Sequence, residues 1–563
     1  MFLNRKIKNK QKIIILICFF ILSVLSILPL LKSNYYPNGS NDLDFHLIRI
    51  AGLAENIKIG NFPTYINFLQ LQGFGYPVDI FYPYTFLIIP ALLYLKSVPM
   101  VLIIKGLFFF VTLITLLSSY YSANSILKNE IASFFSAVFF TFSSYRIYDF
   151  YMRGGIGSTF SFIFLPITFL GIYEILYRDE RKFYLLVIGY SGILLSHFLT
   201  ALITFIFLFI IVIFNLKKLF FQEKFIRLKK LMLAGISVVV LTAFYLLPLF
   251  EQMLSYTSFV NVSSIVNIDE TAAGLMDMIA TSINNSATLP SLGLLIFSAP
   301  LLLLTLKIKK LKIPSVILGS AYIGVFIFFA STNLFPWRLL RPILGVIQYP
   351  ARLLIFSSIF LSLVGGYCIS ILINNSKYKI RTLTLFMFLI FSLIFSQLYS
   401  YRNEENPHPL VNGDFIIDQT TIGVGKEYLP AETDVDFILK NNKISTSNKT
   451  ASISNVTRSG LTIEATIKTA STTDITFPLI YYKGYQAVEI KSDGSEKILP
   501  ISIDKNHLIT TKINQNSNLR IYYKGTMIQK ISSLISLISI VIFLVFLYNN
   551  KKNMSGEDHF PSH

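Results

Sequence analysis

The sequence predicts an α-helical polytopic membrane protein of about 12 or 13 spans, with a small extracytoplasmic β-rich domain. Of its 563 residues, 53% are hydrophobic and only 14% are charged, whereas a soluble protein carries about 25% charged residues. The mean hydropathy is +0.61, and the apolar residues are clustered in long runs. These properties exclude a disordered chain, a nucleic-acid-binding domain and an ordinary cytosolic enzyme.

A membrane-spanning helix needs about 20 predominantly apolar residues. Apolar runs predict crossings near Ile13–Leu31, Val98–Ser119, Ile131–Tyr145, Thr159–Tyr177, Phe183–Leu195, Leu199–Phe214, Leu231–Pro248, Leu292–Leu306, Pro314–Ala330, Leu353–Ile373, Leu383–Tyr399 and Ile531–Leu547. The stretch from 183 to 214 is too long for one crossing, so we expect two short helices that meet outside near Ser196 and His197. Tyr82–Leu95 is interrupted by two prolines, and it is left open whether this segment crosses or forms a re-entrant or interfacial helix.

The basic residues predict the orientation in the membrane. Lys and Arg total 49 and Asp and Glu total 30, which gives a net charge of +19. Most of the cations lie in short loops between apolar runs, a pattern that marks the cytoplasmic side. The clusters are Arg5–Lys12, Arg178–Lys182, Lys217–Lys230, Lys307–Lys312, Lys377–Arg381 and Lys551–Lys552. We therefore expect a multi-pass protein of the cell membrane, with both termini in the cytoplasm and without a nucleic-acid partner.

The hydropathy profile predicts four segments. Residues 1–400 form the multi-span domain with an external loop at 32–81, 401–527 the extracytoplasmic β-rich domain, 528–550 a C-terminal transmembrane anchor, and 551–563 a cytoplasmic tail. The segment 401–527 is the long hydrophilic stretch of the chain. It alternates apolar and polar residues in LTIEATIK (Leu461–Lys468), which is typical of a half-buried strand.

The first external loop contains the sequence NDLDFHLIRIAGLAENIK. Its apolar residues Leu47, Ile50, Leu53 and Ile57 recur at helical spacing. This spacing predicts an amphipathic helix that lies on the outer membrane surface.

Polar residues of the same segment form the first candidate site. Asp42, His46 and Arg49 are spaced i, i+4 and i+7, which places them along one side of a helix. A carboxylate, an imidazole and a guanidinium together at a membrane surface indicate a functional group of side chains. The alternative is that Asp44 is the N-cap and that the two carboxylates serve only to begin the helix.

Arginines on the side predicted to be outside form the second candidate site. Arg146, Arg153, Arg338, Arg341 and Arg352 lie near span ends, where positive charge is normally cytoplasmic. Because a guanidinium binds phosphate through paired hydrogen bonds, these residues indicate an anionic partner that carries phosphate. The alternative is that some of them only reach ordinary lipid headgroups.

His197 lies at the external tip of the predicted helix pair and is either a packed polar residue or a ligand. With Asp42, Asp44 and His46 it leaves open a divalent metal site, and no other cofactor is expected. The patterns GxSxG, HExxH and CxxC and a complete phosphate-binding loop are absent from the sequence. Neither an ATP-driven pump nor a soluble-type hydrolase is therefore supported.

Several short motifs resemble a known bacterial family. They are DLDFHLIR, GYPVDIFYPYTF, YMRGG, LLSHFLTA and QYPAR, in this order over roughly the first 370 residues. The chain resembles the polytopic membrane proteins labelled pyruvoyl-tetrahydropterin-synthase-related and, more distantly, the YfhO-like proteins. FPLIYYKGYQAVEIKSDG also resembles the C-terminal domain of YfhO-like proteins. Both families are similar to the GT-C glycosyltransferase superfamily.

The resemblance implies a membrane glycosyltransferase that moves a sugar from a polyprenyl-phosphate donor to an envelope glycan, lipid or protein. In GT-C enzymes the usual catalytic carboxylate is an Asp of the first external loop, which implies Asp42 or Asp44 here, with Asp42 preferred. Asp149 and Glu251 are further acidic candidates. The substrate-binding candidates are His46, Arg49, Arg153, His197, Arg338, Arg341 and Arg352.

Two other classes of function stay open at this point. A transporter or flippase of lipid-linked saccharides would use the same arginines, but it needs ionisable residues deep inside its spans. The predicted spans carry few such residues. The third class is a non-catalytic membrane protein of envelope assembly.

Overall fold

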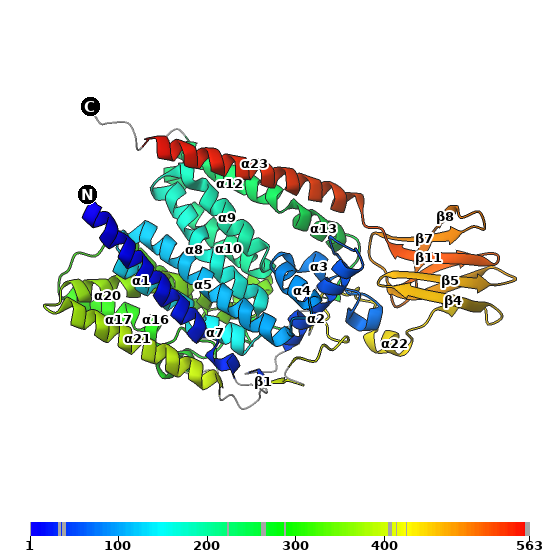
Figure 1. Ribbon diagram of the computed structural model, residues 1–563, viewed down its shortest axis with the longest axis horizontal. Helices are drawn as coiled ribbons and strands as arrows, with labels where there is room; N and C mark the ends of the chain where they lie inside the picture. The colour runs from blue at the N-terminus through cyan, green and yellow to red at the C-terminus, as the bar shows by residue number, and fades with distance from the viewer. Residues whose placement is uncertain are drawn as a thin grey trace. The chain divides into compact units, whose positions relative to one another are not determined.

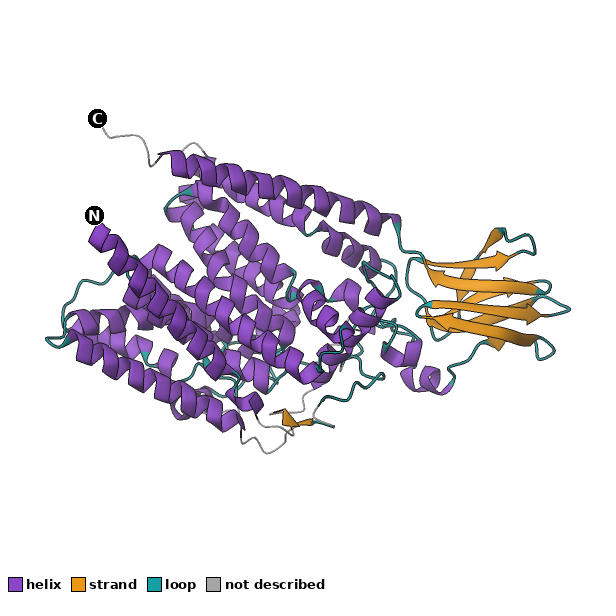
Figure 2. Ribbon diagram, in the orientation of Figure 1, coloured by secondary structure: helices purple, strands orange, loops and turns teal. Residues whose placement is uncertain are grey.

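The computed structural model describes residues 2–31, 35–36, 41–221, 225–259, 266–285, 289–402, 408–411, 414–423 and 425–557. The structure is mostly helical, and its strands lie mainly in the C-terminal part of the sequence (Figures 1 and 2). The chain divides into two compact units. The first comprises Met1–Leu43, Pro99–Ala234 and Ile265–Ile416, and the second comprises Asp44–Val98, Gly235–Ser264 and Ile417–His563. Each of the four segments predicted from hydropathy is one continuous stretch of sequence. Each compact unit, by contrast, is assembled from three separate stretches.

The first unit is helical apart from the short antiparallel pair β1 (Tyr35–Tyr36) and β2 (His408–Pro409). Its principal helices are α1 (Phe2–Ser26), α5 (Met100–Leu127), α6 (Glu130–Thr141), α7 (Ser144–Tyr151), α8 (Ile156–Tyr177), α9 (Tyr184–Leu194), α10 (Phe198–Phe214), α15 (Leu275–Asn284), α17 (Ala299–Ile308), α18 (Ser315–Ala330), α19 (Trp337–Leu344), α20 (Leu354–Asn374) and α21 (Lys379–Arg402).

Glycines allow the central helices of this unit to approach closely. α6 packs against α5 and α20, and α8 packs against α5 and α9. Gly366 of α20 faces the side chain of Ser136 in α6, and Gly189 of α9 faces the backbone of Thr168 in α8. Small residues at such contacts allow apolar helices to pack tightly where neither helix gains from excluding water.

Among the described residues, five helices are long and apolar enough to cross a membrane. They are Met100–Leu127, Ile156–Tyr177, Pro350–Asn374, Lys379–Arg402 and Met527–Asn550. Each overlaps a predicted crossing. Shorter apolar helices include Phe198–Phe214 and Ser315–Ala330. The total of 12 or 13 spans and the orientation of the termini stay predictions.

The structure confirms one predicted break between helices and shows a bend where one straight crossing was predicted. The two short helices expected between 183 and 214 are confirmed, because α9 ends at Leu194 and α10 begins at Phe198. The crossing predicted near Leu231–Pro248 is not one straight helix. α12 (Ile226–Leu241) and α13 (Ala243–Met253) are bent by 73° relative to each other, and hydropathy contains no signal for such a bend.

The predicted β-rich region is confirmed in the second unit. A four-stranded sheet has the order β3-β6-β10-β9 and a five-stranded sheet the order β4-β5-β11-β7-β8, with every pair antiparallel. The strands are β3 (Ser445–Thr446), β4 (Ser452–Ser459), β5 (Thr462–Lys468), β6 (Thr473–Ile480), β7 (Tyr485–Ile490), β8 (Glu496–Leu499), β9 (Ile501–Ile503), β10 (Leu508–Ile513) and β11 (Ser517–Tyr523).

The two sheets share one apolar core. Ile463, Ala465 and Ile467 of β5 alternate inward, as their spacing predicts. They pack in one cluster with Ile475 and Phe477 of β6. The same cluster also contains Phe74, Tyr76 and Val78, so the strand region shares its apolar core with the segment around α3 (Val78–Phe81).

The C-terminal helix is longer than the predicted anchor. α23 runs from Met527 to Glu557 and so includes residues assigned above to a cytoplasmic tail. Hydropathy marks where an apolar run ends, but a helix continues until a residue such as Gly or Pro interrupts it. The first such residue after Met527 is Gly556.

The helix predicted to lie on the membrane surface is instead enclosed by protein. α2 (Asn41–Lys58) buries the apolar residues Leu47 and Leu53, but it also buries His46 and Arg49. A surface helix would leave its polar side in water. The prediction was wrong because both polar side chains have partners inside the protein. The spacing of residues along a helix does not show whether such partners exist.

The segment Tyr82–Leu95 contains η3 (Thr85–Leu87) and α4 (Ile88–Leu95). The 8 residues of α4 are far fewer than the roughly 20 residues that a straight helix needs to cross a bilayer. This segment is therefore not a straight crossing.

Candidate functional site

In the first unit, one guanidinium joins two carboxylates. Arg153 Nε lies 3.1 Å from Asp42 Oδ2, and Arg153 Nη1 lies 2.9 Å from Asp149 Oδ1. The Asp149 side chain is fully buried, while 41% of the Asp42 side chain is exposed. The two carboxylates therefore differ in access: Asp42 lies at the open side of the cluster, and Asp149 anchors Arg153 from within.

The YMRGG motif builds the buried side of this cluster. Asp149 lies in α7, and Arg153 follows the helix one turn later. Gly154 has φ of +72°, a conformation that favours glycine, and it turns the chain into α8. A Cβ on Gly155 would lie 2.9 Å from Asp149 Oδ1. The two glycines thus leave room for the carboxylate, and Ser158 Oγ donates a 2.5 Å hydrogen bond to Asp149 Oδ2.

The surroundings of Asp149 change its pKa in opposite directions. Burial raises the pKa of Asp149, while Arg153 and the hydrogen bond from Ser158 lower it. A buried carboxylate that keeps a guanidinium partner is suited to position that guanidinium. Asp149 was only a subsidiary candidate in the sequence, because the spacing of YRIYDFYMRGG does not show that Asp149 is buried.

Arg352 belongs to the same group of charges. It interacts electrostatically with Arg153, Asp42 and Asp149. Its Nη1 donates to the carbonyl of Ile347 at 2.7 Å and to Gln348 Oε1 at 2.8 Å. Among the described residues, its buried Nε has no hydrogen-bond partner. A second guanidinium is thus fixed by hydrogen bonds near the cluster, and one of its buried N–H groups has no hydrogen-bond partner among the described residues.

The other arginines predicted to lie outside, Arg338 and Arg341, have different surroundings. Arg341 and Arg338 are exposed on α19, and Arg341 pairs with Asp269 at 3.3 Å. The same helix exposes Leu339 and Ile343, with 80% and 76% of their surface accessible. Exposed apolar residues next to arginines are typical of a helix at a lipid interface, which favours headgroup contact for this pair.

Arg146 is buried inside the protein. Its Nη1 donates to the carbonyl of Thr141 at 3.0 Å and its Nη2 to Thr112 Oγ1 at 3.1 Å. These bonds tie α7 to the end of α6 and to α5. Its apolar neighbours and these two acceptors enclose Arg146. The placement of Arg146 on the outer side of the membrane stays a prediction.

In the second unit, His46 and Arg49 contact each other. Arg49 Nη1 lies 3.3 Å from His46 Nδ1. Arg49 Nη2 donates to the carbonyls of Tyr82 and Pro83, both at 2.9 Å, and the guanidinium carbon lies 4.1 Å from the centre of the Tyr82 ring. Arg49 therefore holds the Tyr82–Pro83 turn. The substrate-binding role predicted for these two residues stays a prediction.

Asp44 is half-buried in the first part of α2. The helix begins at Asn41, before both acidic residues. The alternative in which Asp44 is the N-cap is therefore wrong, and Asp42 and Asp44 lie inside the first turns.

His197 has a structural role at the start of α10. It is the N-cap residue, and its Nδ1 lies 3.2 Å from the backbone N of Thr200 and 2.7 Å from Thr200 Oγ1. Within the described part of the chain, no group of three or more His, Cys, Asp or Glu side chains is arranged to hold a metal. The metal site left open for Asp42, Asp44, His46 and His197 thus has no support among these residues.

A second buried carboxylate, Asp79 in the second unit, was missed in the sequence. It lies in α3 (Val78–Phe81) and is 4% exposed, and Thr64 Oγ1 donates a 2.5 Å hydrogen bond to its Oδ2. Burial raises the pKa of Asp79, and the nearby Arg49 and Thr64 lower it. The available signal was an acidic residue inside the aromatic motif GYPVDIFYPYTF, since a lone carboxylate among apolar residues is costly to bury.

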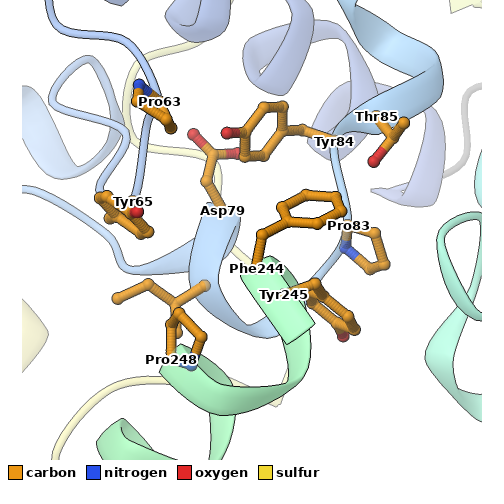
Figure 3. Close-up of a pocket in the computed structure, with 10 residues that line it drawn as sticks. Pro63, Tyr65, Asp79, Pro83, Tyr84, Thr85, Phe244, Tyr245 and Pro248 are labelled. Atoms are coloured by element: carbon orange, nitrogen blue, oxygen red, sulfur yellow. The ribbon is translucent and has the colours of Figure 1, made fainter. Parts of the chain in front are cut away.

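Asp79 lines a pocket within this unit (Figure 3). The aromatic side chains of Tyr65, Tyr84, Phe244 and Tyr245 form much of the wall, together with three prolines. The last two aromatic residues come from α13, and the first two come from the segment that flanks α3. The pocket therefore combines one buried carboxylate with mainly apolar, ring-bearing walls.

No protein-family model matches this chain, and no curated protein matches it. The contacts within the chain are therefore the basis for assigning a function.

Proposed function

We propose that this chain is a GT-C-like membrane glycosyltransferase that moves a sugar from a polyprenyl-phosphate donor to an extracytoplasmic envelope acceptor. The observation that carries the proposal is the placement of Arg153 between the accessible Asp42 and the buried Asp149. An accessible carboxylate beside fixed guanidinium groups supplies both a base and a phosphate-binding centre. The apolar helices are consistent with a donor that is presented by a membrane.

In the proposed reaction, Asp42 accepts the proton of the acceptor hydroxyl. The acceptor oxygen then forms a bond to the anomeric carbon, while the bond from that carbon to the donor phosphate oxygen breaks. Negative charge accumulates on the leaving lipid phosphate. Arg153 leaves its contact with Asp42 in part to bind this phosphate, and the Nε of Arg352 supplies a further donor.

Asp149 and Ser158 act as positioning residues in this scheme. Asp149 holds Arg153 at 2.9 Å, and Ser158 holds Asp149 at 2.5 Å. A guanidinium that is already oriented needs little rearrangement when charge develops on the phosphate. The same buried contacts explain why Arg153, rather than the exposed Arg338 or Arg341, is the proposed phosphate ligand.

The proposed reaction is tested by analysing the cell-envelope glycans of a strain that carries Asp42→Asn. The substitution keeps the size of the side chain and removes its basicity, so we expect the glycan product to be lost while expression and membrane insertion stay normal. Asp277→Asn, at an exposed position of α15, is the matched control. Wild-type amounts of product from the Asp42 variant would exclude Asp42 as the base, and unchanged flipping of a lipid-linked saccharide without transfer would favour a transporter.

The proposed topology places both termini in the cytoplasm and residues 401–527 outside. It is tested by labelling single cysteines in intact cells, after replacement of the native Cys18 and Cys368. We expect a cysteine at Asp493, in the turn after β7, to react with an impermeant maleimide, and one at Lys310 to react only after lysis. The reverse pattern would contradict the orientation and the location of the proposed site.

A further inference from the structure

One side of α19 packs on the protein, and a second side presents apolar side chains outward. Trp337 is buried and Leu340 and Leu344 are half-buried, so these three residues form the inner side. Leu339 and Ile343 lie one turn apart and are largely exposed, so they form the outer side. Burying two such side chains away from water is favourable, which indicates that an apolar phase covers this side.

A third side of α19 carries its two arginines. Arg338 and Arg341 are spaced i and i+3, which places them on neighbouring turns of one side, and both are exposed. Arg341 pairs with Asp269 at 3.3 Å, whereas Arg338 has neither a hydrogen bond nor an ion pair within the described part of the chain. The ion pair leaves the charge of Arg338 unbalanced, so this side of the helix attracts an anion.

The place of α19 in the chain sets it beside the ends of two apolar helices. α18 ends at Ala330 and α20 begins at Leu354, and these helices pack against each other. α20 belongs to a candidate membrane span. Turns precede α19, and Gln348, which follows it, has φ of +63°. Because the hydrocarbon core of a bilayer excludes irregular backbone that faces lipid, this connection lies at a membrane surface.

We propose that α19 is a docking helix for anionic phospholipid, in which Leu339 and Ile343 enter the acyl layer and Arg338 and Arg341 bind headgroup phosphates. An amphipathic helix at an interface takes this orientation, and arginines strengthen its attraction to negatively charged lipids. A guanidinium also donates paired hydrogen bonds to a phosphate. This role replaces the substrate-binding role expected for the two arginines, and it does not depend on the proposed transfer reaction.

The test measures how closely bilayer lipids approach α19 in the full-length protein. After replacement of Cys18 and Cys368, a fluorophore is attached to an Ile343→Cys variant in phosphatidylcholine nanodiscs. Spin-labelled phosphatidylglycerol or spin-labelled phosphatidylcholine is added at the same mole fraction. We expect both lipids to quench the fluorophore, and the anionic lipid to quench it about twofold more strongly. The same fluorophore on Asp493→Cys, in the turn after β7, should not be quenched.

Arg338→Gln should reduce the preference for the anionic lipid and leave quenching by phosphatidylcholine unchanged. Folding is not expected to suffer, because Arg338 is exposed and has no partner among the described residues. Arg381→Gln, at an exposed position of α21, removes the same charge elsewhere and should keep the preference.

Absence of quenching at position 343, or equal quenching by the two lipids in the wild type, would overturn the proposal. An unchanged preference in Arg338→Gln would overturn it as well. Displacement of phosphatidylglycerol by a polyprenyl phosphate at about one hundredth of its mole fraction would overturn it in favour of a donor site. Asp42→Asn should leave the lipid preference unchanged, so this proposal and the transfer reaction fail separately.

Discussion

Arg153 lies 3.1 Å from Asp42, a residue in the first turn of α2, far earlier in the sequence. Asp149 contacts the same guanidinium at 2.9 Å from the buried side. An exposed ion pair contributes little to stability, but a pair fixed by a buried partner has a defined geometry. This geometry makes the pair suitable for chemistry at the surface of an apolar helix bundle.

Arg153→Ala should impair use of the donor and also lower stability. We expect the apparent KM for a polyprenyl-phosphate sugar to rise about tenfold or more, since the phosphate loses a charged hydrogen-bond donor. Leaving Asp149 without its partner should cost about 3–5 kcal/mol. Transfer kinetics and thermal unfolding in detergent measure the two effects. Arg381→Ala, at an exposed position of α21, is the control, and wild-type kinetics for Arg153→Ala would remove Arg153 from the site.

Gly155→Ala should disturb the carboxylate of Asp149. The added Cβ would lie 2.9 Å from Asp149 Oδ1 and 2.7 Å from Ser158 Oγ, so one of these groups has to move. We expect a loss of about 1–3 kcal/mol in the free energy of unfolding. Gly106→Ala in α5 is the matched control, because nothing lies within 4 Å of a Cβ there. Equal stability of the two variants would show that the cluster tolerates the methyl group.

Arg49→Lys should destabilise the protein through the Tyr82–Pro83 turn. Lysine keeps the charge but loses the planar fork that reaches both carbonyls, and it no longer stacks on the Tyr82 ring. We expect a loss of about 2–4 kcal/mol, measured by thermal unfolding, against a change of under about 0.5 kcal/mol for Arg381→Lys. A stable Arg49→Lys variant with a selective defect in donor binding would instead support a substrate-binding role for Arg49.

The stability of the wild type should depend on pH through Asp79. Burial raises the pKa of Asp79 above the ordinary value of 3.8, so the folded chain binds this proton more tightly than the unfolded chain. The favourable contribution of Asp79 is complete below that ordinary value and is lost as the pH rises through the folded pKa. The melting temperature of Asp79→Asn, relative to the wild type, should therefore increase from about pH 4 to about pH 7. A constant difference between the two proteins would show that Asp79 does not titrate in this range.

Local patterns in the sequence were sufficient for the long apolar helices and for β5, but not for the bend between α12 and α13 or the full length of α23. Long apolar runs correspond to long apolar helices, the alternation in Leu461–Lys468 corresponds to β5, and the helix break near His197 was predicted from length alone. These features depend on the periodicity of a helix or a strand and on the thickness of a bilayer. Both leave a pattern in residues that are close together in the sequence.

Tertiary packing decided which polar groups meet. The sequence singled out Asp42 and Arg153 separately, but only the fold brings Asp42 and Asp149 to the guanidinium of Arg153. The fold also buries Arg49, which was expected on a helix at the membrane surface, and Asp79, which no sequence pattern had singled out. The physical reason is that the energy of a charged side chain depends on its partners and its access to water, and both depend on residues that are distant in the chain.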